Sequence, residues 1–222
     1  MGKLQIGGEK KIESIAAYWD AYSSNFDAAH ATETLVLWKQ ELVRTVGESR
    51  KQKILDVGTG TGFLALMLAE SEYDVTGIDI SEAMLAIGRE KADARGLQIP
   101  FIQSTGECTP FPPGSFDAVV NCRVLWTLTE PVVAVREWMR VLKPGGKVIS
   151  FMRVMDVVSE SGDAFYHCEG IPIELPLCCA SEEDYLNIYR AAGLGNIHTE
   201  KLPSALSCAN LPPWSAFIGE KI

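Results

Sequence analysis

The chain has 222 residues, of which 47% are hydrophobic and 22% charged, and this length and composition are ordinary for a single globular domain. Its formal net charge is −9, and a field of that sign disfavours DNA or RNA as a partner because it repels phosphate backbones. No apolar run is long enough to span a bilayer and the first residues lack a signal peptide, so we expect a cytoplasmic protein without a membrane partner.

The cysteines show no spacing typical of a metal site. None belongs to a Cys-x-x-Cys pair and no His-x-x-x-His accompanies them, so we expect no bound metal and, in the cytoplasm, reduced thiols. The six are Cys108, Cys122, Cys168, Cys178, Cys179 and Cys208. The sequence does not distinguish a monomer from a homodimer.

The N-terminal part predicts two helices. Residues 1–11 are polar and contain glycine, and we expect a frayed end there. Aromatic and aliphatic residues recur at helical spacing over residues 12–26 and again over residues 32–46. The first helix carries Ile15, Tyr18, Trp19, Tyr22 and Phe26, and the second carries Leu35, Trp38, Leu42 and Val46.

A glycine-rich turn follows the first predicted strand, residues 54–57. Glycine occupies the first, third and fifth positions from Gly58, and Phe63 stands sixth, where the dinucleotide-binding fingerprint requires glycine. Asp56 ends the strand, and a carboxylate there would repel a pyrophosphate but suits a ligand that carries an ammonium and a sulfonium. No Gly-Lys-Ser/Thr follows, which excludes a P-loop. The turn therefore indicates a cationic nucleoside ligand.

The run Asp56-Val57-Gly58-Thr59-Gly60-Thr61-Gly62 resembles the first motif of class I S-adenosylmethionine-dependent methyltransferases, in particular the small-molecule, ubiquinone/menaquinone-methyltransferase-like type. The likeness extends over roughly residues 15–202. It implies an α/β fold with a Rossmann-like, seven-stranded, mostly parallel sheet, helices on both faces and the last strand antiparallel. It also implies S-adenosyl-L-methionine as cofactor.

The second strand, residues 73–80, ends at Asp79, about twenty residues past the glycine turn. An acid at this place lies within reach of both ribose hydroxyls of a bound nucleoside. The alternative is that Asp79 only caps the helix that follows. We expect Ser81 to cap that helix, which runs to about Ala94 with Met84 facing the sheet.

A short third strand, residues 99–103, leads into a loop at 104–111. The resemblance implies that Thr105, Gly106 and Glu107 bind the adenine edge. Thr105 stands where the family usually has an acid, and its hydroxyl lacks the charge that strengthens a hydrogen bond. We therefore expect weaker adenine binding and a clear gain in cofactor affinity in Thr105→Asp.

The fourth strand, residues 115–122, ends beside the expected methyl group. We assign Asn121 and Cys122 to the cofactor, and Arg123 and Trp126 to the substrate. The alternative interpretation is structural, with Arg123 paired to an acid and Trp126 in the core. Asp117, within the strand, is expected to be structural.

The remaining elements follow in order. Thr129 is expected to cap a helix over 130–142, residues 143–146 form a turn, and the fifth strand covers 147–151. Residues 152–180 fit no period and are interpreted as a substrate-binding insertion that includes Tyr166. A capping box at 181–184 opens a helix to about Ala192, and an antiparallel pair, 197–202 with 216–222, completes the sheet. The whole is one methyltransferase domain, 1–222, divided into a helical lid (1–47), a cofactor-binding core (48–151), the insertion (152–180) and a C-terminal helix and hairpin (181–222).

Taken with the resemblance, these features predict transfer of a methyl group by in-line displacement to a small-molecule acceptor. The expected cofactor-binding residues are Tyr22, Asp56, Gly58, Thr59, Gly60, Gly62, Asp79, Ile80, Met84, Thr105, Gly106, Glu107, Asn121 and Cys122. His167 and His30 are candidates for a general base, because the pKa of histidine lies near neutrality.

Other interpretations stay open at this point. The cysteines of the C-terminal half allow methylation of a soft atom such as a thiol, against the simpler view that they are buried and inert. The chain could also be a non-catalytic regulatory protein that binds S-adenosylmethionine or S-adenosylhomocysteine, and a Rossmann oxidoreductase is a weaker third interpretation.

Overall fold

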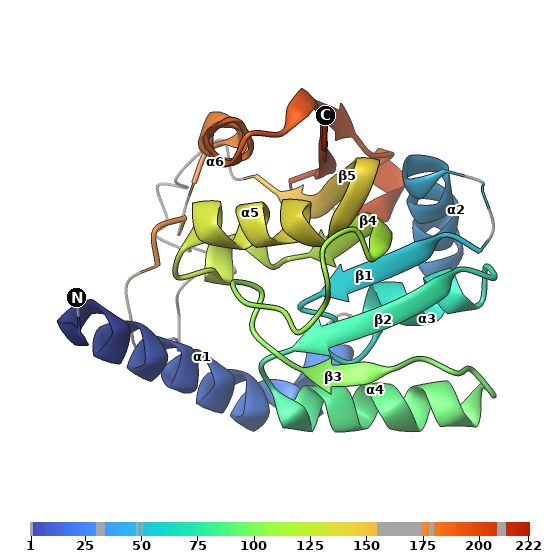
Figure 1. Ribbon diagram of the computed structural model, residues 1–222. Helices are drawn as coiled ribbons and strands as arrows, with labels where there is room; N and C mark the ends of the chain where they lie inside the picture. Colours follow the sequence, from blue (N-terminus) through green and yellow to red (C-terminus); the bar gives the residue numbers. More distant parts are fainter. Residues whose placement is uncertain are drawn as a thin grey trace.

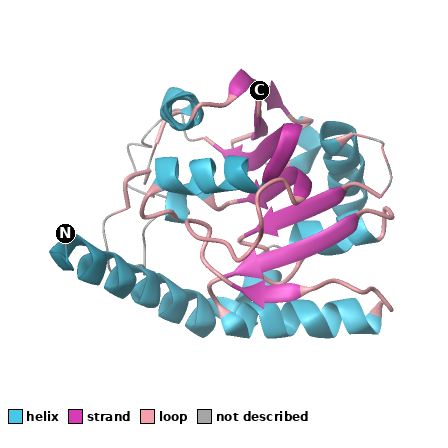
Figure 2. Cartoon of the chain, viewed as in Figure 1, coloured by secondary structure: helices cyan, strands magenta, loops and turns pink. Residues whose placement is uncertain are grey.

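The computed structural model describes residues 2–29, 34–47, 49, 51–154, 175–177, 180–207 and 212–222, with the side chains of the first helix given for 10–28. These residues form one seven-stranded sheet with helices on both faces (Figure 1, Figure 2). The strands are β1 (Lys53–Val57), β2 (Asp74–Asp79), β3 (Phe101–Gln103), β4 (Phe116–Cys122), β5 (Leu142–Arg153), β6 (Gly195–Lys201) and β7 (Trp214–Glu220).

The strand order is β3-β2-β1-β4-β5-β7-β6. The first five strands in this order pair in parallel, whereas β7 pairs antiparallel with both β5 and β6. The expected Rossmann-like sheet with an antiparallel last strand is therefore confirmed. All parallel strands end at one edge, where ligands bind in sheets of this kind.

Two helical layers cover the two faces, because successive side chains of a strand point to opposite sides. Ile54 of β1 packs in one core cluster with residues of α2 (Leu35–Val46), α3 (Phe63–Ala69) and α4 (Glu82–Ala94). The next residue, Leu55, packs in the other cluster with α5 (Pro131–Val141) and α6 (Glu182–Ala192). Two short 3-10 helices are η1 (Leu125–Thr127) and η2 (Ser204–Leu206).

The helix α1 (Gly2–Ala29) lies across the edge toward which β1 and β2 point, and it contacts α4 (Figure 1). The expectation of a frayed end over residues 1–11 was wrong, since the helix already begins at Gly2. No proline occurs in this stretch, and each interior glycine costs only about 1 kcal/mol, so nothing breaks the helical hydrogen-bond ladder. None of the described helices is both long enough and apolar enough to cross a bilayer.

The sequence predicted the N-cap residues of two helices correctly and that of a third incorrectly. Ser81 caps α4 by accepting a hydrogen bond from the Met84 N–H at 3.1 Å, and the predicted capping box opens α6. By contrast, α5 has Glu130 and not Thr129 at its N-cap, because Pro131 sets the first helical position.

The fifth strand also begins earlier than the predicted residue 147. β5 starts at Leu142 because this stretch pairs with Phe116 of β4, and Gly145 and Gly146 hydrogen-bond with Lys221 near the end of the chain. These partners are distant in sequence, so local pattern could not show them.

Candidate cofactor-binding site

The glycine turn between β1 and α3 has a backbone that other residues rarely adopt. Gly58, Gly60 and Gly62 have φ values of 63°, 54° and 87°. A Cβ on Gly58 would collide with Val124, whereas a Cβ on Gly60 would meet nothing within 4 Å. The turn is therefore closed toward the protein at Gly58 and open at Gly60, where a ligand can approach the backbone closely.

Asp56 holds the turn from inside. Its side chain is 1% exposed, and Oδ2 accepts hydrogen bonds from Thr59 Oγ1 at 2.7 Å and from Ala65 N at 3.1 Å. Burial outweighs these two bonds and raises the pKa of Asp56 to about 7. The carboxylate is thus a negative charge that a cationic ligand would stabilise.

Asp79 stands across the same turn, at the end of β2. Its Oδ2 accepts from Gly60 N at 2.9 Å and its Oδ1 accepts from Ser81 N at 2.9 Å. Burial again dominates these bonds and raises the pKa of Asp79 to about 6. Asp79 therefore links the turn to the start of α4. Each carboxylate oxygen can accept a further hydrogen bond, so this contact does not exclude binding to a ribose.

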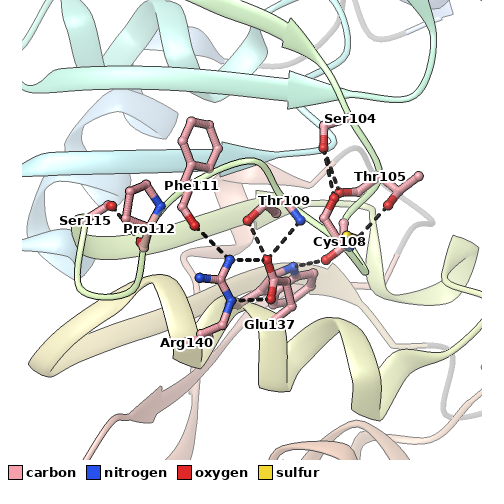
Figure 3. A network of polar contacts seen from close by, with 11 residues as sticks. Ser104, Thr105, Cys108, Thr109, Phe111, Pro112, Ser115, Glu137 and Arg140 are labelled. Atoms are coloured by element: carbon pink, nitrogen blue, oxygen red, sulfur yellow. Dashed lines mark hydrogen bonds and ion pairs between the residues drawn. The ribbon is translucent and has the colours of Figure 1, made fainter.

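The loop expected to bind adenine is anchored to α5 (Figure 3). Glu137 Oε1 accepts hydrogen bonds from Thr109 N at 2.9 Å and Thr109 Oγ1 at 2.6 Å, and Arg140 pairs with Glu137 and donates to the Phe111 carbonyl. Within the loop, Thr105 Oγ1 accepts from the Cys108 N–H at 3.2 Å.

Gly106 and Glu107 are held by the same layer. The Gly106 carbonyl accepts a hydrogen bond from Trp138 Nε1 at 2.9 Å. Glu107 Oε1 accepts from Thr129 N at 3.2 Å and from Thr129 Oγ1 at 3.1 Å. The structure thus brings Thr105, Gly106 and Glu107 together on one anchored loop.

The residues predicted at the end of β4 point in different directions. Asn121 is fully buried toward α6, where its Nδ2 donates to Ser150 Oγ at 2.8 Å and Ser150 in turn hydrogen-bonds with Tyr189. Cys122 lies on the opposite face and accepts a hydrogen bond from Arg123 Nη1 at 3.4 Å. The Asn121 side chain is therefore engaged within the core, and sequence reasoning did not anticipate this.

Trp126 is 6% exposed and packs against Trp19 of α1, with ring centroids 6.2 Å apart. This agrees with the alternative interpretation of Trp126 as a core residue. Tyr22 stacks on Tyr18 in the same helix at 6.1 Å. The two predicted residues, Tyr22 and Trp126, thus belong to one aromatic layer between α1 and η1.

Two acids of α1, which sequence reasoning did not single out, fasten this helix to the site. Asp20 Oδ1 accepts from Ser81 Oγ at 2.6 Å and from Ala83 N at 3.2 Å, next to Asp79. Asp27 accepts from Thr61 Oγ1 of the glycine turn at 2.7 Å and pairs with Lys91. Their spacing of seven residues places both on one helix face, which was the available signal.

Met84 and Ile80 were also assigned to the cofactor, and His30 and His167 were the candidate bases. Met84 is 2% exposed in α4, and the Ile80 carbonyl accepts from Gln103 Nε2 at 3.0 Å. His30, Tyr166 and His167, together with Cys168, Cys178, Cys179 and Cys208, lie outside the described residues. Their assigned roles stay predictions.

Comparison with known proteins identifies the family. Residues 55–150 match the family model described as "Methyltransferase domain". The ubiquinone/menaquinone biosynthesis C-methyltransferase of Yersinia enterocolitica is 34% identical over 175 residues, covering 74% of this chain and 70% of that protein. The chain therefore belongs to the class I S-adenosylmethionine-dependent methyltransferases, in the branch that includes the ubiquinone and menaquinone methyltransferases.

Two more comparisons show how much of a relative the chain covers and which fold it shares. The demethylmenaquinone methyltransferase of Thermus thermophilus is 41% identical over 114 residues, which are 50% of this chain and 52% of that protein, so the chain spans about half the length of that relative. An S-adenosylmethionine-dependent methyltransferase from Aquifex aeolicus is 20% identical and superposes with a TM-score of 0.66 over 83% of this chain and 89% of that chain. This likeness shows a shared fold.

The residues present fit the cofactor of the family. Gly60 leaves the backbone open to a ligand, and Asp56 and Asp79 are two desolvated carboxylates whose raised pKa values would fall beside an ammonium or sulfonium. A dinucleotide would instead place a pyrophosphate against these acids. The donor and acceptor groups of the turn thus suit S-adenosylmethionine.

Proposed function

We propose that this protein binds S-adenosyl-L-methionine at the glycine turn and transfers its methyl group to a small-molecule acceptor. The observation that carries the proposal is the pair of desolvated carboxylates, Asp56 and Asp79, at the open turn around Gly60. When bound, the cofactor supplies a methyl group already activated by the sulfonium, so the protein needs mainly to orient the reactants and exclude water.

Each part of the site has a role in this proposal. Asp56 fixes the turn and contributes negative charge, and Asp79 presents its remaining lone pairs to the ribose hydroxyls. The loop of Thr105, Gly106 and Glu107 lines the adenine, and α1 covers the edge of the sheet. His30 and His167 remain the candidate bases for an acceptor that arrives protonated.

The names of the relatives support a small molecule as acceptor. Both the Yersinia and the Thermus protein are named for methylation of quinone compounds. We also keep, as a prediction, the division of the chain into a helical lid (1–47), a cofactor-binding core (48–151), a substrate-binding insertion (152–180) and a C-terminal part (181–222). The cytoplasmic location and the absence of a nucleic-acid partner also stay predictions.

Calorimetric titration with S-adenosylhomocysteine tests the cofactor site. We expect Asp79→Asn to weaken binding by about tenfold or more, because a charge-assisted acceptor is lost. Asp74→Asn is the matched control, since Asp74 is an exposed acid at the opposite end of β2, and it should bind like the wild type. Equal affinities in wild type and Asp79→Asn would contradict the assignment of the site.

Transfer of labelled methyl from the cofactor to a pool of cellular small metabolites tests the reaction. Labelled product with wild type, and clearly less with Asp79→Asn at a cofactor concentration near the wild-type dissociation constant, is the expected result. Tight binding of S-adenosylhomocysteine without any transfer would instead make the protein a regulatory binder.

A further inference from the structure

The loop that follows β3 begins beside Asp79. Asp79 pairs with Gln103, the last residue of β3, and its carbonyl accepts a hydrogen bond from the Ser104 N–H at 2.9 Å. Neighbouring strands of a sheet lie about 4.8 Å apart. A nucleoside whose ribose is bound at Asp79 therefore reaches this loop with its base, because β3 lies one strand further from the glycine turn than β2.

The same loop returns to the glycine turn at Gly106. A Cβ on Gly106 would lie 3.2 Å from Cγ1 of Val57, the residue before Gly58, so the loop packs on the end of β1. Thr105 stands between this contact and the one at Ser104, and it is partly exposed. A base beside the turn can thus meet Thr105 at the surface, without entering the core.

The hydroxyl of Thr105 keeps both a donor and an acceptor for a ligand. A threonine hydroxyl has one O–H donor and two lone pairs, and its hydrogen rotates to suit its partner. One lone pair accepts from the Cys108 N–H at 3.2 Å (Figure 3). Within the described part of the chain, the O–H itself has no acceptor. The oxygen is therefore fixed in place, while the hydrogen stays free to turn.

The other polar groups of the loop are directed toward the protein. Glu107 is the only charged residue among residues 104–111, and its Oε1 accepts from the N–H and the hydroxyl of Thr129. The Gly106 carbonyl accepts from Trp138 Nε1. The side chain that remains for the edge of a purine is thus the neutral hydroxyl of Thr105.

Purine bases differ in the group that such a hydroxyl would meet at C6. Adenine carries an amino group there, which donates a hydrogen bond, whereas hypoxanthine carries a carbonyl oxygen, which accepts one. An ionised carboxylate can only accept, so it would pair with the amino group and repel the carbonyl oxygen. A hydroxyl can pair with either group, because it donates as well as accepts.

We propose that Thr105 widens the choice of base at the cofactor site, so that the site binds 6-oxopurine nucleosides such as S-inosylhomocysteine as well as S-adenosylhomocysteine. This inference rests on the proposed function and adds a second class of ligand to the same site. A carboxylate at residue 105 would restrict the site to the 6-amino base.

Calorimetric titration with S-adenosylhomocysteine and S-inosylhomocysteine tests the inference. We expect wild-type dissociation constants that differ by less than about tenfold, because a neutral hydroxyl pairs with either group. In Thr105→Asp the adenosyl compound should bind about tenfold more tightly than in wild type and the inosyl compound about tenfold more weakly, because a charged acceptor strengthens one bond and opposes the other. The Cys108 N–H can still donate to the new carboxylate, so the loop is retained.

Hypoxanthine also carries a proton at N1 that adenine lacks, and this difference is common to all variants. The preference for the adenosyl compound is therefore compared between wild type and variants. Thr105→Ser keeps the hydroxyl and should keep the wild-type preference. Ser115→Asp is the matched control for added charge, because Ser115 precedes β4 at the opposite edge of the sheet, and it should leave both affinities unchanged.

A wild type that prefers S-adenosylhomocysteine by more than about tenfold would overturn the inference, because a neutral hydrogen bond does not supply more than this. A preference that Thr105→Asp leaves unaltered would overturn it as well. In both cases S-adenosylhomocysteine still binds, which leaves the proposed function standing. Failure of the wild type to bind either compound would instead contradict the proposed cofactor site.

Discussion

At the scale of single residues, Asp56 favours binding of a cationic ligand but destabilises the ligand-free protein. Its carboxyl group is buried with a pKa of about 7, well above the usual value of 3.8. At pH 8 the folded protein therefore holds a desolvated negative charge, whereas at pH 5 the group is protonated. A cationic ligand removes this cost by supplying the missing counter-charge.

We predict that Asp56→Asn raises the free energy of unfolding of the ligand-free protein at pH 8 by about 1 kcal/mol or more, and raises it clearly less at pH 5, where the folded carboxyl group is protonated. The amide oxygen can still accept from Thr59 and Ala65, so the turn is retained. Affinity for S-adenosylhomocysteine should fall about tenfold at pH 8. Urea unfolding and calorimetric titration measure the two effects.

Asp117→Asn is the control for this prediction. Burial opposes ionisation of Asp117, but hydrogen bonds from Lys143 and Lys53 outweigh it and hold its pKa below the usual value. Asp117 is therefore ionised at both pH values, and its substitution should destabilise the protein equally at each. A loss of stability in Asp56→Asn that is the same at pH 5 and pH 8 would contradict the prediction.

The sequence placed Asp56 and Asp79 correctly beside the glycine turn, because the motif and the spacing from Gly58 to Asp79 are local properties of one strand–turn–helix–strand unit. It did not show that Asn121 turns toward Tyr189. Such a contact depends on which strands become neighbours and on which face each residue takes. Asp20 was missed for the same reason, since its partner Ser81 lies 61 residues away.

At the scale of elements, α1 packs through Ile15 and Trp19 and is joined to the glycine turn and α4 by polar contacts near its C-terminal half. Asp20 reaches the start of α4, and Asp27 reaches Thr61 and Lys91. The Asp27–Lys91 pair is partly exposed, and such pairs contribute about 0.2–1 kcal/mol. Polar contacts of this strength can open at the C-terminal half of α1 without unfolding the sheet.

We predict that the double variant Asp20→Asn/Asp27→Asn increases the dissociation rate of S-adenosylhomocysteine several-fold, while its unfolding free energy changes by less than about 2 kcal/mol. The reason is that both acids tie α1 over the turn and over the start of α4. Stopped-flow displacement measures the rate. Glu13→Gln, an exposed acid on the same helix, is the control and should leave it unchanged.

An unchanged dissociation rate in the double variant would show that α1 does not restrain the ligand.

The elements themselves were mostly predicted from local pattern, since α4 and α6 carry their own caps at Ser81 and Ser181. The beginnings of α1 and β5 were misplaced. Helix propensity alone does not fix the first, and pairing with the chain end near Lys221 decides the second.

At the scale of the whole molecule, the carboxyl groups divide into two sets with opposite effects on stability. Burial raises the pKa of Asp56 to about 7 and that of Asp79 to about 6. Glu137 behaves in the opposite way, because its hydrogen bonds with Arg140 and Thr109 outweigh burial and lower its pKa. The fold could be predicted from the resemblance of the sequence motifs to the methyltransferase family, but this division of the carboxyl groups depends on tertiary burial and could not be predicted.

We predict that the melting temperature of the ligand-free protein falls as the pH rises from about 5 to 8. Asp56 and Asp79 have folded pKa values above their unfolded ones, so the unfolded chain releases their protons first and stability declines through this window. Groups of lowered pKa, such as Glu137, lose their contribution only at more acidic pH. Stability without ligand should therefore be greatest at mildly acidic pH.

Saturating S-adenosylhomocysteine should move this optimum toward neutral pH, because its ammonium lowers the pKa values of both acids and its binding adds stability by linkage. Differential scanning calorimetry between pH 4.5 and 8.5, with and without ligand, measures the shift. Asp56→Asn/Asp79→Asn is the control that removes both buried acids, and it should show a flatter profile. A wild-type profile that rises from pH 5 to 8 without ligand, or one that the double substitution leaves unaltered, would show that the two buried acids do not govern the pH dependence of folding.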